Sequence, residues 1–221
     1  MLSPFDDLTN DLIWQHSDTT ATYSLRYDTR TGKRDIAIDD LGEPWNSSSI
    51  EEWVLPAITT CTVVHVGALS NSDFTTRALA SLSRRKYLSL DAQALVRPGN
   101  LGTVKMQAPT SLDLLEHVTI LKLSLEEAAV LDIHPKTASM RTLGIPEVVL
   151  TAGTDGAFIY TNGRTVKVTS EIIKSDETTG AGDAFIACYL NARIRGTDSS
   201  DSGNIAAKCV TEMLRRRIEK A

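Results

Sequence analysis

Residues 178–184 read Thr-Thr-Gly-Ala-Gly-Asp-Ala and join a glycine-rich turn to the start of a helix. The helix is indicated by apolar residues that recur at the three- and four-residue spacing of one buried face, namely Phe185, Cys188, Tyr189 and Ala192. Glycine lets backbone amides approach a ligand, and the unpaired N–H groups and positive dipole end of a helix attract an anion. The stretch therefore predicts an anion site at the helix entry, formed by Gly180, Ala181 and Gly182.

Asp183 stands in the first turn of this predicted helix. A carboxylate at that position lies within reach of a hydroxyl beside the anion, where a general base for phosphoryl transfer must be. The alternative is structural, because acidic residues commonly offset the helix dipole and a glycine turn is often only a tight connection. The residues alone leave both interpretations open.

Residues 178–185 resemble the C-terminal signature of the ribokinase-like (PfkB-type) small-molecule kinases. The resemblance implies that Asp183 is the catalytic base, that the amides of residues 180–182 form an anion hole, and that the cofactors are ATP and Mg²⁺. The family usually has aspartate directly before its Thr-x-Gly, whereas this chain has Glu177 there and Asp176 one step earlier. The departure falls near the monovalent-cation site of the family. The resemblance implies a monovalent cation as a further candidate cofactor.

Residues 121–128 (Leu-Lys-Leu-Ser-Leu-Glu-Glu-Ala) resemble the Asn-x-x-Glu element of the family. Ser124 replaces the usual asparagine, and Glu127 matches the glutamate that arranges magnesium-bound water. Lys122 is placed to approach a phosphate, and one carboxylate suits Mg²⁺ because this ion keeps several waters and takes few protein ligands. The structural alternative, favoured on the sequence alone, is a helix start with Ser124 as N-cap and Glu127 completing a capping box.

Residues 149–157 resemble the strand and loop that contact ATP phosphates in these kinases. Small residues at Thr151, Gly153 and Gly156 would let backbone and hydroxyl groups meet the nucleotide, although a plain turn explains them too. The nucleotide is expected to lie across this loop and near Asn204 and Ala207. Residues 90–97 resemble a strand-end segment of a subgroup that includes inositol and related sugar kinases.

Short apolar runs alternate with helical stretches in the second part of the chain, at residues 62–66, 87–90, 118–121 and 148–151. This alternation predicts a parallel sheet covered on both faces, with ligands beyond the carboxyl ends of the strands, where Gly67, Asp91, Lys122 and Gly153 follow. Asn162-Gly163 predicts a closing antiparallel hairpin, and an apolar stripe from Ala206 to Ile218 predicts a final amphipathic helix. The expected fold class is α/β, a ribokinase-like three-layer sandwich with a mainly parallel central sheet.

The N-terminal part carries two alternating runs, at residues 21–27 and 34–38, which predict a hairpin with its turn at 29–32. A hairpin with one apolar and one polar face suits a small lid over a cleft or pairing with another subunit. A homodimer through this hairpin is therefore a candidate. Residues 39–49 are interpreted as a linker. The expected organisation is an N-terminal lid-like segment at 1–49 and a nucleotide-binding and catalytic domain at 50–221.

The leading hypothesis is an ATP-dependent kinase that phosphorylates a hydroxyl of a sugar or polyol. The resemblance covers roughly residues 19–221, and the family's opening strand with its substrate-binding aspartate and Gly-Gly element is missing. The alternative is an N-terminally shortened, catalytically incomplete module that binds nucleotide or dimerises. An unrelated α/β nucleotide binder is disfavoured, because the chain has neither a Gly-x-x-x-x-Gly-Lys-Ser/Thr loop nor a strand followed by Gly-x-Gly-x-x-Gly.

The composition excludes several classes of protein. A net charge of -5 argues against nucleic-acid or acidic-membrane binding, and the basic cluster Arg215–Arg217 is expected to complement a helix dipole and solvate a face. Three distant cysteines and four scattered histidines indicate neither a disulfide framework nor a zinc site, and the histidines are interpreted as structural. With no signal-peptide pattern and no apolar run near ~20 residues, we expect a cytoplasmic protein without membrane partners.

Overall fold

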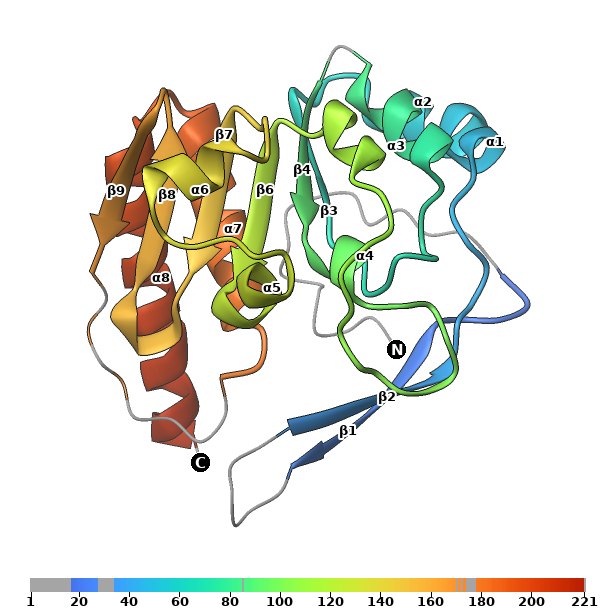
Figure 1. The fold of residues 1–221 in the computed structure, drawn as a ribbon, viewed down its shortest axis with the longest axis horizontal. Coiled ribbons are helices and arrows are strands. Elements are labelled where there is room, and N and C mark those ends of the chain that lie inside the picture. Colours follow the sequence, from blue (N-terminus) through green and yellow to red (C-terminus); the bar gives the residue numbers. More distant parts are fainter. Residues whose placement is uncertain are drawn as a thin grey trace.

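The centre of the computed structural model is a six-stranded sheet of order β3-β4-β6-β7-β8-β9 (Figure 1). The structure describes residues 17–27, 34–84, 86–169, 171, 173 and 178–220. The first four strands are mutually parallel, and β8 and β9 are antiparallel additions. Their bounds are Val63–Val66 (β3), Tyr87–Asp91 (β4), Ile120–Ser124 (β6), Glu147–Thr151 (β7), Ala157–Thr161 (β8) and Arg164–Val168 (β9). The predicted mainly parallel sheet is confirmed.

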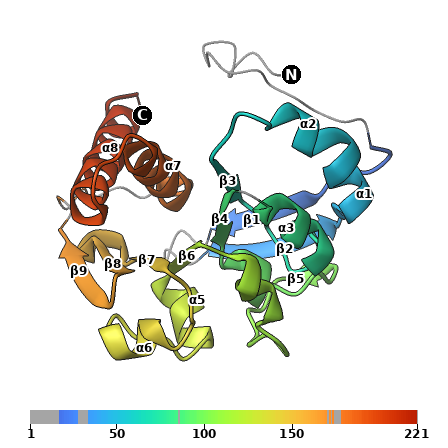
Figure 2. The same ribbon diagram turned by 90° about the horizontal axis from the view of Figure 1, so that it is seen from above.

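Helices cover both faces of this sheet, which gives three layers (Figure 2). Helices α7 (Ala181–Ile194) and α8 (Ser199–Lys220) pack on one face, where Ile120 and Val149 point. Leu121 and Val148 are buried in the core of the opposite face, since neighbouring residues of a strand point to opposite sides. That side holds α3 (Thr76–Ser83), α4 (Gln93–Val96), α5 (Leu125–Val130) and α6 (Thr137–Arg141).

The antiparallel end of the sheet forms as the turn residues predict. Asn162 and Gly163 both have positive φ, 50° and 74°, and they connect β8 to β9. Two consecutive positive φ values match the right-handed twist of the flanking strands, and asparagine followed by glycine adopts them at low cost.

The predicted N-terminal hairpin is confirmed as β1 (Thr22–Tyr27) paired antiparallel with β2 (Arg34–Asp40), while its predicted turn lies outside the described residues. A third short strand that we did not predict, β5 (Gly102–Thr103), pairs with β2 and completes a separate small sheet. Figure 1 shows this sheet projecting from the main body.

The predicted linker at residues 39–49 contains regular structure. It holds the end of β2 and the short helix α1 (Ser47–Ser49), which a π-helical turn at Ile50–Val54 and α2 (Leu55–Ala57) extend. Trp45 stacks on Trp53 and on Phe74, with ring centroids 5.2 and 6.1 Å apart. These rings fasten the segment to the main body. Two 3-10 turns, at Asp113–His117 and Gly153–Asp155, complete the elements.

The predicted end of the third parallel strand was wrong. The sequence placed that strand at 118–121 with Lys122 beyond it, but β6 continues to Ser124 because Lys122, Leu123 and Ser124 pair with Val149, Leu150 and Thr151. A lysine inside a buried strand is tolerated here because it meets a carboxylate. In the part of the chain that the structure describes, no helix is both long and apolar enough to cross a membrane.

Candidate active site

Helix α7 begins as the glycine-rich stretch predicts. Gly180 is the N-cap residue with φ 80°, a left-handed conformation that glycine adopts without strain, and no side chain caps the helix. The backbone N–H groups of Ala181 and Ala184 bond to carbonyls of the turn, at 3.0 and 2.9 Å. The N–H groups of Gly182 and Asp183 have no hydrogen-bond partner among the described residues. The helix entry therefore presents unpaired donors, as an anion site requires.

Asp183 is exposed in the first turn of α7. It forms no ion pair with any other residue that the structure describes. Its charge does reach the interior of the site: burial lowers the pKa of the His65 imidazole on β3, and the Asp183 carboxylate is one of the charges that oppose this lowering. The carboxylate is thus positioned near the carboxyl ends of the parallel strands without a competing partner, and its role as the base stays a prediction.

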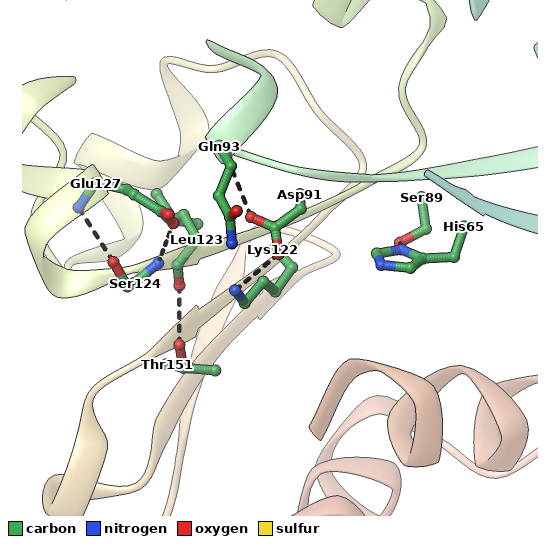
Figure 3. A network of polar contacts seen from close by, with 9 residues as sticks. All are labelled: His65, Ser89, Asp91, Gln93, Lys122, Leu123, Ser124, Glu127 and Thr151. Carbon is green, nitrogen blue, oxygen red and sulfur yellow. Dashed lines mark hydrogen bonds and ion pairs between the residues drawn. The ribbon is translucent and has the colours of Figure 1, made fainter. Parts of the chain in front are cut away.

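Lys122 and Asp91 form a buried ion pair beside this helix entry (Figure 3). The distance from Lys122 Nζ to Asp91 Oδ2 is 2.8 Å, and the two side chains are 5% and 2% exposed. A Cβ atom added to Gly182 would lie 3.0 Å from Lys122 Nζ, so only glycine lets the ammonium lie against the first turn of α7. Lys122 is therefore next to the predicted anion hole, but its charge is already balanced by Asp91.

Ser124 and Glu127 form the capping box that the structural alternative predicted. The Ser124 N–H donates to Glu127 Oε2 at 2.8 Å, and the Glu127 N–H donates to Ser124 Oγ at 3.2 Å. Burial raises the pKa of the Glu127 carboxyl, and the neighbouring Asp91 carboxylate raises it further. Glu127 is thus both a cap and one of two close buried carboxyl groups.

Replacing Glu127 by glutamine tests the cost of that buried carboxyl. A glutamine keeps the acceptor of the capping box. Because folding raises the pKa of Glu127, the folded state binds the proton more tightly, so its stability falls as the pH rises from the unfolded pKa of about 4.3 through the higher folded pKa. We expect Glu127→Gln to be as stable as wild type or more stable at pH 7 in urea unfolding, with the difference vanishing below about pH 4.

The matched control is Glu126→Gln, which changes an exposed carboxyl on the same helix. It should show no pH-dependent difference from wild type. A Glu127→Gln protein that is clearly less stable at pH 7 would mean that the ionised carboxyl contributes more than it costs.

Thr151 ends β7 directly beside Ser124 and donates its hydroxyl hydrogen to the Leu123 carbonyl at 3.2 Å. After it, Gly153 is exposed with open space around its Cα, and Gly156 adopts φ 88° where β8 begins. The structure therefore brings together the α7 entry, Lys122, the capping box and the start of the glycine loop at one edge of the sheet.

Two predicted nucleotide contacts do not join this group. Ala207 is 5% exposed and packs in the core between α7, α8 and the sheet. Asn204 is exposed on α8 beside Gly203, where α8 lies against Ile159 of β8 and Val168 of the edge strand β9. Both residues were assigned to the nucleotide within the family-based kinase hypothesis, and the packing of Ala207 in the core could not be predicted that way.

Two polar residues near the site, His65 and Gln93, were not predicted from the sequence. His65 Nδ1 lies 3.0 Å from Ser89 Oγ, and its pKa lies below the ordinary value, chiefly because surrounding protein atoms reduce its hydration. The Oε1 atom of Gln93 is buried without a partner among the described residues. A signal existed for His65: strand alternation puts Ser89 on the same face as Asp91, and the register pairs His65 with Ser89.

A cavity of about 870 Å³ opens next to His65. Its described lining comes from the end of β3 and the loop that follows, His65–Leu69, and from the N-terminal segment, Leu41–Asn46 with the Trp53 ring. Asp183 is not part of the described lining. A second hollow of about 580 Å³ runs along α8 from Lys208 to Arg217.

The model of the pfkB family of carbohydrate kinases matches residues 9–217. The chain belongs to this family. Within the pfkB family, it is 28% identical over 122 residues to a ribokinase of Schizosaccharomyces pombe, covering 49% of this chain and 38% of the relative. It is 31% identical over 121 residues to an inositol 3-kinase of Oryza sativa subsp. japonica, covering 51% of this chain and 29% of the relative. A ribokinase of Mus musculus is 27% identical, with coverages of 84% and 61%.

The aligned regions thus span less than two thirds of these pfkB-family relatives. Solved structures show the same fold over more of the chain. A pyrophosphate-dependent kinase of the ribokinase family in complex with sulfate superposes with a TM-score of 0.78 at 19% identity, covering 90% of this chain and 71% of that one. The Arabidopsis thaliana ribokinase complexed with ribose and ATP gives a TM-score of 0.66 at 17% identity, with coverages of 89% and 63%.

Proposed function

We propose that this pfkB-family chain is an ATP-dependent phosphotransferase that acts on a hydroxyl of a sugar or polyol. The observation that carries the proposal is the entry of α7, where unpaired N–H groups and an exposed carboxylate share one helical turn beside Lys122. Family membership and the ribokinase and inositol-kinase relatives support the acceptor class.

In the proposed reaction, Asp183 accepts the proton of the acceptor hydroxyl while that oxygen bonds to the terminal phosphorus of ATP. The bond from this phosphorus to the bridging oxygen breaks, and the electron pair leaves with ADP. The amides of Gly180 and Gly182 donate to the oxygens of the transferred group, whereas the N–H of Ala181, the third predicted donor, bonds to the Thr178 carbonyl at 3.0 Å. Positioning and charge stabilisation supply most of the acceleration in such transfers, which suits a site built from backbone donors.

The residues present fit a magnesium ion held through water. Burial raises the pKa of the Glu127 carboxyl, the nearby Asp91 carboxylate raises it further, and a cation would relieve the repulsion between the two groups. Among the described residues no group of three or more His, Cys, Asp or Glu side chains could hold a metal alone, which agrees with an ion that keeps most of its waters. When bound with ATP, the ion neutralises charge on the phosphates.

The proposal also covers the domain division, the oligomeric state and the cellular location. The β1–β2 hairpin, separate from the central sheet, supports a division into residues 1–49 and 50–221, although β5 of the second part adds the third strand of the small sheet. The exposed Leu25 on the edge strand β1 supports a homodimer through the hairpin. A cytoplasmic location is also proposed, since three cysteines without disulfides suit a reducing compartment. The monovalent cation that the family resemblance implies would lie near Glu177, which is outside the described residues, and the proposed reaction does not include it.

The test is a turnover screen on protein of verified mass. Ribose, fructose, inositol and nucleosides are offered with ATP and Mg²⁺, and ADP formation and phosphorylated product are measured; pyrophosphate replaces ATP in a parallel series. We expect one polyol or sugar to give Mg²⁺-dependent product with ATP. Calorimetric ATP binding without turnover on any acceptor would instead support the catalytically incomplete module, and turnover only with pyrophosphate would reject ATP as the donor.

A further inference from the structure

The last turns of α8 contact the glycine-rich turn that precedes α7. Helices α7 and α8 are consecutive and pack against each other, so Arg217 of α8 meets a residue 38 positions earlier in the chain. Its Nη1 atom donates to the Thr179 carbonyl oxygen at 2.6 Å, and its Nη2 atom lies 3.7 Å from where a Cβ of Gly180 would be. The half-buried guanidinium therefore lies directly against the turn that forms the predicted anion hole.

The two neighbouring arginines, Arg215 and Arg216, pair with carboxylates and not with the turn. Arg215 binds the exposed Glu171 carboxylate, and Arg216 pairs with Glu212 one helical turn away. Arg217 has no carboxylate partner within the described part of the chain and uses a main-chain carbonyl instead. Arg215, Arg216 and Arg217 were expected to form one solvent-exposed cluster. Of the three, only Arg217 contacts the turn that precedes α7.

Two cationic side chains, Lys122 and Arg217, lie against the turn that precedes α7, and they differ in whether a carboxylate balances them. Lys122 also lies against the α7 entry, but Asp91 balances it at 2.8 Å. Arg217 is consequently the cation beside the turn whose charge no described carboxylate offsets. A positive charge at a helix N-terminus adds to the field that attracts a phosphate, and a charged hydrogen bond fixes the carbonyl that orients the turn.

A guanidinium at this place conflicts with a bound monovalent cation. Ions such as K⁺ are held by rings of oxygen atoms, backbone carbonyls above all. The Thr179 carbonyl oxygen already accepts a bond from a fixed cation at 2.6 Å, and a second positive charge close to it would be repelled. The residues that conflict with the expected cation are thus Thr179 and Arg217, both of which the structure describes.

We propose that Arg217 is the built-in cation of the glycine turn, a positioning residue that holds the Thr179 carbonyl and makes phosphoryl transfer independent of K⁺ or Na⁺. The proposal deepens the proposed kinase function and rests on it for its kinetic readout.

The experiment compares kcat in potassium, sodium and choline chloride at one ionic strength, for wild type, Arg217→Gln and Arg216→Gln. Wild type should vary by less than about twofold between the salts. Arg217→Gln should lose about 10- to 100-fold in kcat, the range for a charged hydrogen bond, and should regain part of it with added methylguanidinium or with K⁺. Arg216→Gln, with the same charge change on the same helix, should match wild type.

ATP affinity, measured by calorimetry in the same salts, separates this proposal from the kinase proposal. Should no acceptor turn over, the kinase proposal fails, and the cation proposal still predicts salt-independent ATP binding in wild type and weaker, cation-rescued binding in Arg217→Gln. Urea unfolding of Arg217→Gln and Arg217→Lys shows whether a loss is one of folding. Strong K⁺ activation of wild type, or a folded Arg217→Gln with full, cation-independent activity and affinity, would overturn the assignment.

Discussion

Replacing Asp183 by asparagine is expected to lower kcat by about 10²–10⁴-fold, the contribution typical of a general base, while ATP affinity stays within about twofold. The amide has the shape of the carboxylate but cannot accept the hydroxyl proton. Asp183 is exposed and makes no ion pair with the described residues, so the variant should fold normally. Steady-state kinetics with the best acceptor, calorimetric ATP binding and a urea unfolding curve measure the three quantities.

Asp201→Asn is the matched control for that variant, because Asp201 is also an exposed aspartate in the first turn of a long helix, α8. It should leave kcat unchanged. Normal turnover in Asp183→Asn would remove Asp183 from the role of base, and an equal loss in both variants would point to the helix dipole instead of to proton transfer.

Replacing Lys122 by methionine is expected to lower the free energy of unfolding by about 3–5 kcal/mol, because it leaves the Asp91 carboxylate buried without its counter-charge. The two side chains are only 5% and 2% exposed, so water cannot take the place of the ammonium. Methionine keeps most of the volume of lysine, so the loss is electrostatic rather than a cavity effect. Equilibrium urea unfolding measures it.

The double variant Lys122→Met with Asp91→Asn removes both charges and should recover part of that loss, since a neutral buried pair lacks the uncompensated charge. The control Lys208→Met changes an exposed lysine of α8 and should shift stability by less than about 0.5 kcal/mol. A single Lys122→Met variant as stable as this control would show that Asp91 is protonated or hydrated when its partner is absent.

The features that local sequence specifies were predictable. The α7 entry follows from glycines set before a helical repeat, the β8–β9 turn from Asn162-Gly163, and the Ser124–Glu127 capping box from residues three apart. In each case the residues that determine the geometry are neighbours in the chain.

The features that depend on distant partners were not predictable. Lys122 looked like the residue after a strand, because the carboxylate that lets it stay inside β6 is 31 residues away. The strand β5 has two residues and is defined only by its pairing with β2. Arg217 belongs to a basic run whose three members appear equivalent until α8 packs beside α7.

The contact between Arg217 and Thr179 also sets an order of events during synthesis. A ribosome exposes the glycine turn and Asp183 well before it releases the last turns of α8, because 38 residues separate the two partners. The nascent chain can pair every strand of the central sheet while this turn still lacks its guanidinium. The final helix, and not the sheet, would then complete the polar surroundings of the turn.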